Sequence, residues 1–473
     1  MSDLRELLVR TAERAAQYRA TVADHPVARP VDLSVLEAAF GGALAEHGAP
    51  ADEVIDELVR AVEPGLVATA GPRFFGFVVG GALDSATAAD MLAAGWDQPA
   101  FNAVTSPAAA AAEAVAGRWL KELLGLPRGA SFGFVTGGQG ANTVALAAAR
   151  HHVLTRVGWN VEESGLIGAP SIRVVASEER HATIDRALRL LGLGVAAVRP
   201  VRADGNGAID LDHLEQVLES LPDGPTIVCL QAGNVNTGAC DDLAAGCELA
   251  RRHGAWVHVD GAFGLWAAAS RRTRHLLSGI EAADSWAVDG HKWLNVPYDS
   301  GYVFCAHPEA HSAAMAYTAA YLVGQGAVGA RGPSDFVPES SRRARGFATW
   351  AALRELGRQG VEDLVDRCCA LARRFADGLS AVEGVEVVND VVLNQVLVSF
   401  GSDDRTDMVI DAVQRGGVCW VGGTSWHGRR LMRISVSNWT TTETDVDRSV
   451  AAMLSARSML DASTSVTGAD PRP

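Results

Sequence analysis

The chain has almost no lysine. Among 473 residues, Lys121 and Lys292 are the two lysines, and arginine supplies the other long cations. A protein this dependent on arginine keeps a lysine where a deprotonatable amine is needed, for example for Schiff-base chemistry. Lys121 lies in an amphipathic helical pattern, which predicts a solvated surface charge. Lys292 lies between an apolar run and Trp293, and its position alone leaves open a reactive amine or a snorkelling surface lysine.

Other features are also missing. No apolar run is long enough to span a bilayer and the N-terminus lacks a signal pattern, so a soluble cytoplasmic protein without membrane partners is expected. The formal net charge of −15 argues against a nucleic-acid partner, which would need a basic patch. The seven cysteines show no CxxC or His/Cys spacing, so neither disulfides nor a metal is expected, and they read as reduced core residues.

The sequence divides into four predicted segments. Residues 1–70 follow helical periodicity. Residues 71–345 form a large domain in which near-continuous apolar strands alternate with helices, a pattern typical of a mostly parallel sheet covered on both faces. This domain includes a Gly-, Ala- and Pro-rich stretch, 313–345, expected to be a mobile loop. Residues 346–456 predict a smaller α/β domain, and residues 457–473 a flexible tail.

A glycine-rich turn follows one predicted strand and opens a helix. The stretch Thr136-Gly137-Gly138-Gln139-Gly140-Ala141-Asn142 lacks the lysine of a Walker loop and does not fit GxGxxG. Glycines let backbone approach an anion, and a helix N-terminus presents free N–H groups and the positive end of a dipole. The turn is either a phosphate cradle or a plain strand-to-helix connection.

Two more polar residues lie where predicted strands end. Asp260 could accept a hydrogen bond from a protonated ring nitrogen or simply cap the next helix. His181 could stack on a planar ligand or be an ordinary surface histidine. The combination is more specific than its parts: an anion cradle, a histidine, an aspartate and then Lys292, in that order on alternating strands, is what a pyridoxal 5′-phosphate site requires.

The chain resembles the group II pyridoxal-phosphate-dependent amino-acid decarboxylases, which include aromatic-L-amino-acid and glutamate decarboxylases and share the aspartate aminotransferase fold. The resemblance covers about residues 70 to 440. Its motifs are Pro72-Arg73-Phe74-Phe75, Ser106-Pro107, His181, Asp260 with Ala262 in an HVDxA motif, His291-Lys292-Trp293, and the basic run 342–345. The fold it implies is the α/β PLP-dependent transferase fold of type I, with a seven-stranded-type sheet and a small C-terminal α/β domain.

The resemblance also implies roles for single residues. Lys292 would be the Schiff-base lysine, Asp260 the partner of the pyridine nitrogen, and His181 the residue that stacks on the ring. Tyr321, on the mobile loop, would return a proton after CO2 leaves, with Tyr317 as its backup. The remaining residues implied to contact the cofactor are Gly137, Gly138, Gln139, Asn234, Ala262, Asp289 and His291. Two of these depart from the family pattern, because Asp289 replaces an asparagine and Asn234 lies in an altered turn.

The expected reaction is decarboxylation of an L-amino acid to the amine and CO2. The predicted substrate pocket consists of Arg73, Phe75, Phe77, Trp96 and Phe101; its aromatic members slightly favour an aromatic or apolar side chain, whereas Arg73 could serve an acidic substrate. Oxidative deamination to an aldehyde, transamination and aldol-type cleavage remain alternatives with the same cofactor. A non-catalytic α/β binding protein is a further alternative. The family further implies a homodimer with shared active sites. Residues 1–70 of each copy would pack across the dimer interface.

Overall fold

Two β-sheets organise the chain in the computed structural model, which describes residues 3–317 and 332–467. The larger sheet has seven strands in the order β1-β7-β6-β5-β4-β2-β3, and β7 alone runs antiparallel to its neighbours. The strands are β1 (Ser131–Val135), β2 (Arg173–Ser177), β3 (Val198–Val201), β4 (Thr226–Gln231), β5 (Trp256–Asp260), β6 (Ser285–Asp289) and β7 (Gly301–Cys305). The mostly parallel seven-stranded sheet predicted from the sequence is confirmed.

Helices cover both faces of this sheet. The central strands β4, β5 and β6 are therefore buried along their whole length. Alternate residues of β5 face opposite sides: Trp256 packs in the cluster formed by α6 and α8, and Val257 packs in the main core with α9, α10 and α12. The helices of this part are α4 (Asp84–Trp96), α5 (Pro107–Leu123), α6 (Gly138–Thr155), α7 (Val161–Ser164), α8 (Ala182–Leu190), α9 (Leu211–Ser220), α10 (Leu243–Arg252) and α11 (Pro308–Met315). Short 3₁₀ turns are η1 (Val22–Asp24), η2 (Glu63–Gly65), η3 (Val195–Ala197), η4 (Gly264–Ala269), η5 (Arg274–Leu277), η6 (Ile280–Ala282) and η8 (Pro333–Phe336).

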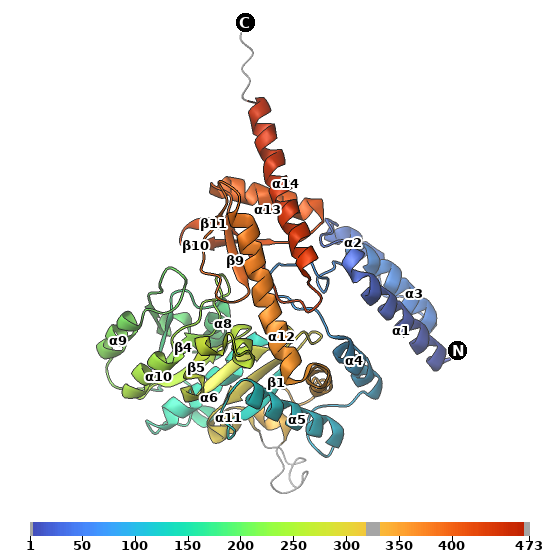
Figure 1. Ribbon diagram of the computed structural model, residues 1–473. Coiled ribbons are helices and arrows are strands. Elements are labelled where there is room, and N and C mark those ends of the chain that lie inside the picture. The colour runs from blue at the N-terminus through green and yellow to red at the C-terminus, as the bar shows by residue number, and fades with distance from the viewer. Residues whose placement is uncertain (1–2, 318–331, 468–473) are drawn as a thin grey trace.

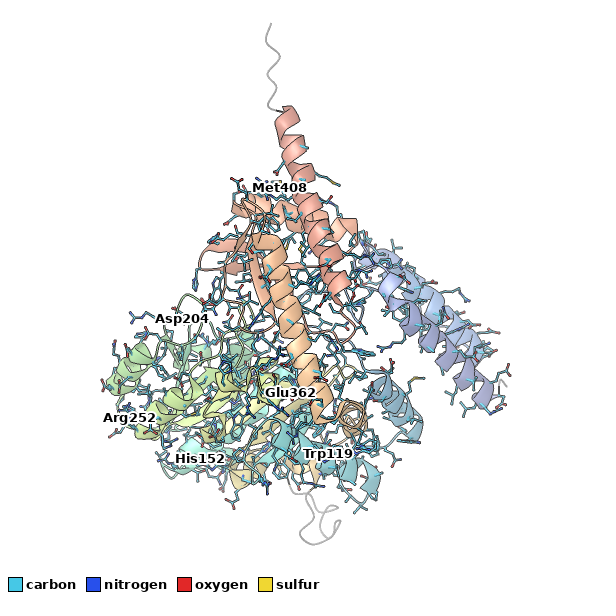
Figure 2. All side chains as sticks on the ribbon, in the orientation of Figure 1. Trp119, His152, Asp204, Arg252, Glu362 and Met408 are labelled. Carbon is cyan, nitrogen blue, oxygen red and sulfur yellow. The ribbon has the colours of Figure 1, made fainter. Side chains whose placement is uncertain are left out.

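The smaller sheet is antiparallel, in the order β10-β11-β9-β8. Its strands are β8 (Glu386–Val387), β9 (Gln395–Ser399), β10 (Gly422–Trp426) and β11 (Arg429–Ser435), with α13 (Asp403–Gly416) and α14 (Glu443–Thr467) beside them. The long helix α12 (Gly346–Ser380) runs between the regions of the two sheets and bends at Gly357, whose backbone is not helical (Figure 1). Side chains fill the space between these layers, with Glu362 midway along α12 (Figure 2).

Three predictions about local structure need correction. The C-terminal tail was expected from residue 457, but α14 continues to Thr467, and Asp461 forms ion pairs with Arg405 and Arg457. Lys121 is not a surface charge: it is 7% exposed, and its Nζ donates to the carbonyl oxygens of Arg128 (2.6 Å) and Ala130 (2.5 Å). The apolar run 195–198 predicts a strand that begins at Val195. Residues 195–197 instead form a 3₁₀ turn, and β3 starts only at Val198.

The N-terminal helices form an arm beside the body of the molecule (Figure 1). The arm consists of α1 (Leu4–Thr21), α2 (Leu33–Phe40) and α3 (Ala51–Val62), whose helical character confirms the expectation for this region. Within the three helices only Ala61 is buried, and large apolar side chains are exposed to solvent, such as Phe40 (60% exposed) at the end of α2 and Leu44 (100% exposed) in the connection from α2 to α3. Within the described ranges, no helix combines the length and apolar character needed to cross a membrane.

Candidate active site

Lys292 follows directly after β6, at the edge where the parallel strands end. Its Nζ lies 2.8 Å from Oδ2 of Asp289, and the two side chains are 22% and 2% exposed. The other oxygen of Asp289, Oδ1, accepts the backbone N–H of Gly138 at the N-terminus of α6. The amine and the neighbouring buried carboxylate therefore meet a helix N-terminus that lies 151 residues before Asp289 in the sequence.

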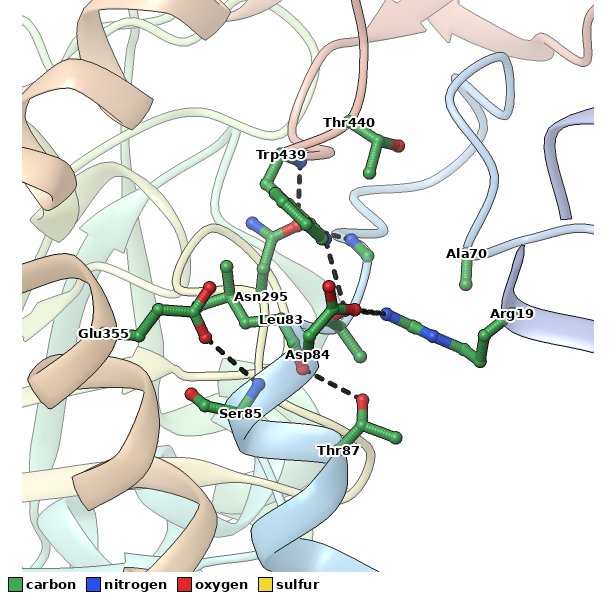
Figure 3. A network of polar contacts seen from close by, with 12 residues as sticks. Arg19, Ala70, Leu83, Asp84, Ser85, Thr87, Asn295, Glu355, Trp439 and Thr440 are labelled. Carbon is green, nitrogen blue, oxygen red and sulfur yellow. Dashed lines mark hydrogen bonds and ion pairs between the residues drawn. The ribbon is translucent and has the colours of Figure 1, made fainter. Parts of the chain in front are cut away.

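Asn295, three residues after Lys292, connects this turn to two other segments of the chain (Figure 3). The Oδ1 atom of Asn295 accepts N–H groups from Gly81 (2.5 Å) and Trp439 (3.0 Å). Its Nδ2 donates to the carbonyl oxygens of Trp293 (2.9 Å) and Ser437 (2.9 Å). Asn295 is fully buried and has a positive φ of 55°, which asparagine tolerates better than most residues. It therefore fastens the lysine turn to both the small domain and the segment around residue 81.

The glycine-rich turn is shaped for close approach. A Cβ at Gly137 would lie 2.8 Å from Cε1 of His291, and a Cβ at Gly138 would lie 2.8 Å from Oδ2 of Asp289. Side chains larger than hydrogen are therefore excluded here. The first turn of α6 directs its N–H groups to this space, and the carboxylate of Asp289 already accepts one of them. The turn thus already donates to one anionic group, the carboxylate of Asp289. This favours the phosphate-cradle interpretation over a plain strand-to-helix connection.

His291 faces the same glycine-rich turn, and its hydrogen bonds fix the tautomer of its ring. Its Nδ1 accepts the backbone N–H of Ser300 (3.1 Å), which leaves the proton on Nε2, 3.4 Å from Oδ1 of Asp289. Burial lowers the pKa of His291, against the opposing effect of Asp289. The neutral imidazole therefore presents an N–H donor toward the anion-binding turn.

His181 and Asp260 lie within electrostatic reach of each other. His181 is the N-cap of α8, and its Nδ1 accepts from the N–H of Thr183 (3.3 Å) with the Thr183 hydroxyl at 2.9 Å. Burial lowers the pKa of His181 most strongly, Asp260 raises it, and Lys292 and Arg433 lower it further. These groups therefore share one neighbourhood, as the sequence predicted for the first three.

Asp260 ends β5 and is 5% exposed. Its Oδ1 accepts the N–H of Ala262 (3.3 Å), and its Oδ2 accepts Nδ2 of Asn142 (3.1 Å). The carbonyl oxygen of Ala262 in turn accepts the N–H of Asp289 (2.8 Å), which joins the ends of β5 and β6. These residues fit pyridoxal 5′-phosphate: a helix N-terminus and His291 for the phosphate, Lys292 for the aldehyde and Asp260 for a protonated ring nitrogen.

Two residues predicted to contact the cofactor have side chains engaged elsewhere. The Nε2 atom of Gln139 lies 3.2 Å from Oγ1 of Thr143 and 3.3 Å from the carbonyl oxygen of Thr183, so Gln139 offers the anion-binding turn its backbone rather than its amide. Asn234 is 1% exposed and closes a turn: its Oδ1 accepts the N–H of Asn236 (2.9 Å), and its Nδ2 donates to the carbonyl oxygen of Glu179 (3.3 Å).

The residues predicted for the substrate pocket are not brought together. The guanidinium of Arg73 is buried and donates to Asp445 and to the carbonyl oxygens of Val418 and Ala23, so it is not free to bind a substrate carboxylate. Phe75 is 2% exposed and packs against Phe375 in the core. These are corrections: both side chains stabilise the fold instead of lining a cavity.

The three other aromatic residues lie nearer the surface. Trp96 is 52% exposed and packs edge-on against Phe347, and Phe101 is half-buried. Phe77 is 61% exposed and stacks on Trp420 at 5.6 Å. The segment that carries Phe77 continues to the lysine, because a Cβ at Gly80 would lie 2.0 Å from the carbonyl oxygen of Lys292.

Sequence reasoning missed Arg433 and Trp420. Burial lowers the pKa of Arg433, and its Nη1 donates to the carbonyl oxygen of Val235 at 3.1 Å. Within the described ranges it forms no ion pair with a carboxylate. Both residues come from the small domain, more than 100 positions after Lys292, and no motif marks them. Tyr321 lies outside the described residues; Tyr317 is described, and its hydroxyl lies 2.7 Å from that of Ser340.

Comparisons with known proteins agree with this geometry. The model of the pyridoxal-dependent decarboxylase conserved domain matches residues 36–401. Tryptophan decarboxylase 1 of Oryza sativa subsp. japonica is 27% identical, over 92% of this chain and 90% of its own length. A phenylacetaldehyde synthase of Arabidopsis thaliana is 26% identical over 89% of each chain. The crystal structure of Oryza sativa TDC with PLP and tryptamine superposes with a TM-score of 0.90 at 24% identity, covering 97% of this chain and 98% of the other.

Proposed function

The chain belongs to the pyridoxal-dependent decarboxylase family, and on that premise we propose that it converts an aromatic L-amino acid to its amine and CO2. It is a pyridoxal 5′-phosphate-dependent amino-acid decarboxylase. The observation that carries the proposal is the meeting of Lys292, the N-terminus of α6 and the Asp260–His181 pair at one edge of the sheet. When bound, the cofactor accepts the electrons released as CO2 leaves Cα.

Each protein group has a proposed task around that cofactor. The amine of Lys292 binds the cofactor aldehyde covalently, and the Asp260 carboxylate holds a proton on the ring nitrogen. The N–H of Gln139 and the Nε2–H of His291 hold the phosphate beside Gly137 and Gly138, where the absence of side chains leaves room for it. The His181 ring packs on the cofactor ring.

The substrate contacts come partly from residues outside the predicted pocket. The guanidinium of Arg433 binds the substrate carboxylate, a role supported by its partial burial without an ion-pair partner in the described part of the chain. Phe77 and Trp420 form an apolar face for the substrate side chain, supported by their stacking and by the path of residues 77–80 to Lys292. The names of two relatives, tryptophan decarboxylase and phenylacetaldehyde synthase, also support an aromatic substrate.

The test is a spectrum followed by product analysis. We expect the purified protein, loaded with pyridoxal 5′-phosphate, to show visible absorbance that borohydride removes, and to release CO2 from aromatic L-amino acids well above acidic ones. Protein that remains colourless after reconstitution would contradict the cofactor role of Lys292. CO2 release from glutamate or aspartate alone would contradict the proposed substrate class.

The similarity to phenylacetaldehyde synthases makes aldehyde formation the second candidate. We propose that Tyr321 returns the proton to Cα and so directs the reaction to the amine, because a phenolic proton donor completes simple decarboxylation. In air, with O2 as the oxidant, the Tyr321→Phe variant is then expected to form aldehyde, ammonia and hydrogen peroxide at the expense of amine, with Tyr317→Phe as the control. An unchanged amine-to-aldehyde ratio in Tyr321→Phe would exclude this role.

We also propose the domain limits 1–70 and 71–345, a small domain that begins at residue 346 and includes the whole of α14, a cytoplasmic location and a homodimer. The exposed apolar side chains of the arm, among them Phe40 and Leu44, support a second copy of the chain as the partner. Side chains project from the arm into open space on its outer side (Figure 2). Sedimentation of the purified protein tests the dimer, and a monomer at micromolar concentration would contradict it.

A further inference from the structure

We propose that Trp256, Ser285, His258 and Asn142 form a one-way chain of hydrogen bonds that ends on Asp260 and holds its carboxylate ionised toward the ring nitrogen of the cofactor. The four are positioning residues, since they act through Asp260. The inference rests on the proposed role of Asp260 and adds what keeps that carboxylate in one charge state.

The chain of contacts runs along one face of the sheet. Trp256, His258 and Asp260 alternate along β5, so their side chains point to the same side, the side that α6 covers. Ser285 is the register partner of His258 on β6. Asn142 lies in α6, four residues after Gly138.

The contacts are short and continuous. Trp256 Nε1 lies 3.0 Å from Ser285 Oγ, and Ser285 Oγ lies 3.0 Å from His258 Nδ1. His258 Nε2 lies 2.9 Å from Asn142 Oδ1, and Asn142 Nδ2 lies 3.1 Å from Asp260 Oδ2. Relative exposure is 0% for Asn142, His258 and Ser285, 2% for Trp256 and 5% for Asp260, so water does not provide alternative partners.

The direction of every bond follows from the tryptophan. An indole N–H can only donate, so Ser285 Oγ accepts from Trp256 and gives its single proton to His258 Nδ1. His258 must then carry its proton on Nε2 and donate to Asn142 Oδ1. Asn142 consequently turns Nδ2 toward Asp260, whose Oδ2 has to accept. All four donors point toward the carboxylate.

The opposite direction is blocked. A protonated Asp260 would donate to the Asn142 oxygen, and the chain would reverse until His258 Nδ1–H donated to Ser285. Ser285 Oγ would then receive two donors and would need another acceptor for its own proton, and none is recorded for it in the described part of the chain. Reversal therefore leaves a buried hydroxyl unsatisfied, which is unfavourable. Burial also lowers the pKa of His258 to about 4, so the ring stays neutral with the single N–H that the chain needs.

The chain reaches further than Asp260. The second Nδ2 hydrogen of Asn142 points at Thr183 Oγ1 (3.0 Å), and that hydroxyl lies 2.9 Å from His181 Nδ1. Asn142 therefore links the proposed ring-nitrogen partner to the proposed ring-stacking residue.

The test compares two cofactors in the full-length protein. Pyridoxal 5′-phosphate has the ring nitrogen, whereas 1-deazapyridoxal 5′-phosphate has carbon there and keeps the phosphate and the aldehyde. Dissociation constants are measured by titrating the visible absorbance, and thermal unfolding checks that each variant folds. A general packing defect weakens both cofactors, but a defect in Asp260 weakens only the first.

Asn142→Leu and His258→Leu are expected to weaken pyridoxal 5′-phosphate about tenfold, and the deaza analogue about twofold or less, because they remove a donor chain to a charged group. Trp256→Phe removes only the N–H that sets the direction and should have a smaller selective effect, about threefold. His258→Gln keeps both a donor and an acceptor and is expected to restore most of the loss. Trp286→Phe is the matched control. The Nε1 of this buried tryptophan donates to the carbonyl oxygen of Ile280 (2.9 Å), which takes no part in the series of hydrogen bonds that ends on Asp260.

Equal weakening of both cofactors by Asn142→Leu and His258→Leu would overturn the inference. If those variants do not fold, an equal effect of Trp256→Phe on both cofactors would overturn it instead. Asp260→Ala separates the two levels of the argument. Selective weakening in Asp260→Ala alone refutes the donor chain but keeps the proposed role of Asp260, and no selectivity in Asp260→Ala refutes that role itself.

Discussion

Glu113→Gln tests the ion pair that anchors the C-terminal end of the predicted mobile loop, at Arg342. Glu113 lies on α5 and Arg342 precedes α12; their side chains are 1% and 2% exposed. Arg342 Nη2 lies 2.9 Å and 2.7 Å from the two carboxylate oxygens, and its Nη1 donates to the carbonyl oxygen of Phe134 at 3.1 Å. Phe134 belongs to β1, the strand that leads into the anion-binding turn. Arg342 and Glu113 therefore connect the end of the predicted loop to α5 and to β1, the strand that precedes the glycine-rich turn.

The expected cost follows from burial. The glutamine keeps the shape of the side chain and removes its charge, which leaves a buried guanidinium without a counter-charge. Breaking a buried pair in this way costs about 3–5 kcal/mol. An unfolding entropy of about 2.1 cal/mol/K per residue makes that roughly 3–5 °C in Tm if the chain unfolds as one unit.

The same helix provides the control. Glu122 on α5 pairs with Arg358 on α12 at 2.7 Å, but these side chains are 68% and 58% exposed. Glu122→Gln should change stability by less than about 1 kcal/mol, since solvent screens the pair. Both variants are compared with the parent by calorimetry of the loaded enzyme. Equal melting temperatures for Glu113→Gln and Glu122→Gln would refute the argument from burial.

Three further outcomes are expected. Lys292→Arg keeps the positive charge beside Asp289 but cannot bind the aldehyde, so borohydride-sensitive absorbance and CO2 release should both disappear; retained CO2 release at the parental rate would exclude the lysine as the anchor. The pKa of His258 in the folded protein, about 4, lies below its ordinary value of 6.5, so the unfolded chain binds the extra proton first as the pH falls. The free energy of unfolding should therefore fall by roughly 3 kcal/mol between pH 6.5 and pH 4. Denaturant unfolding of the parent and of His258→Gln measures this fall, and identical pH slopes for the two proteins would contradict it. Leu44→Glu with Phe40→Glu should shift sedimentation toward the monomer, and an unchanged dimer would exclude the arm from the interface.

The fold was predictable because its signals are local. Apolar strands alternating with helices specify a mostly parallel sheet, and Ser106-Pro107 marks the start of α5, where Ser106 Oγ accepts the N–H of Ala109 at 3.2 Å. The core of the site was predictable for a similar reason. Asp260 ends a strand, His181 and Lys292 each follow one within four residues, and the topology of a parallel sheet brings such positions to one edge.

The cations could not be placed from the sequence, because their partners are distant. Lys121 meets carbonyl oxygens of the loop that precedes β1, and Arg73 meets Asp445, 372 residues away. Arg433 lies partly buried near His181 only because β11 packs beside the large domain. A helical or strand pattern records which residues are apolar, but not which carbonyl or carboxylate will meet a long side chain after folding.

One helix explains why distant motifs act together. Gly138 opens α6 at the anion-binding turn, and Asn142 follows one turn later and contacts Asp260. The step of four positions from Gly138 to Asn142 advances about 6 Å along the helix axis, so a single rigid element sets the distance between the phosphate end and the ring-nitrogen end of the site. The glycine-rich turn and the HVDxA motif are more than 100 residues apart, yet α6 keeps them in register. A change of length within the first turn of α6 should therefore damage both ends at once, whereas substitutions at either end alone should not.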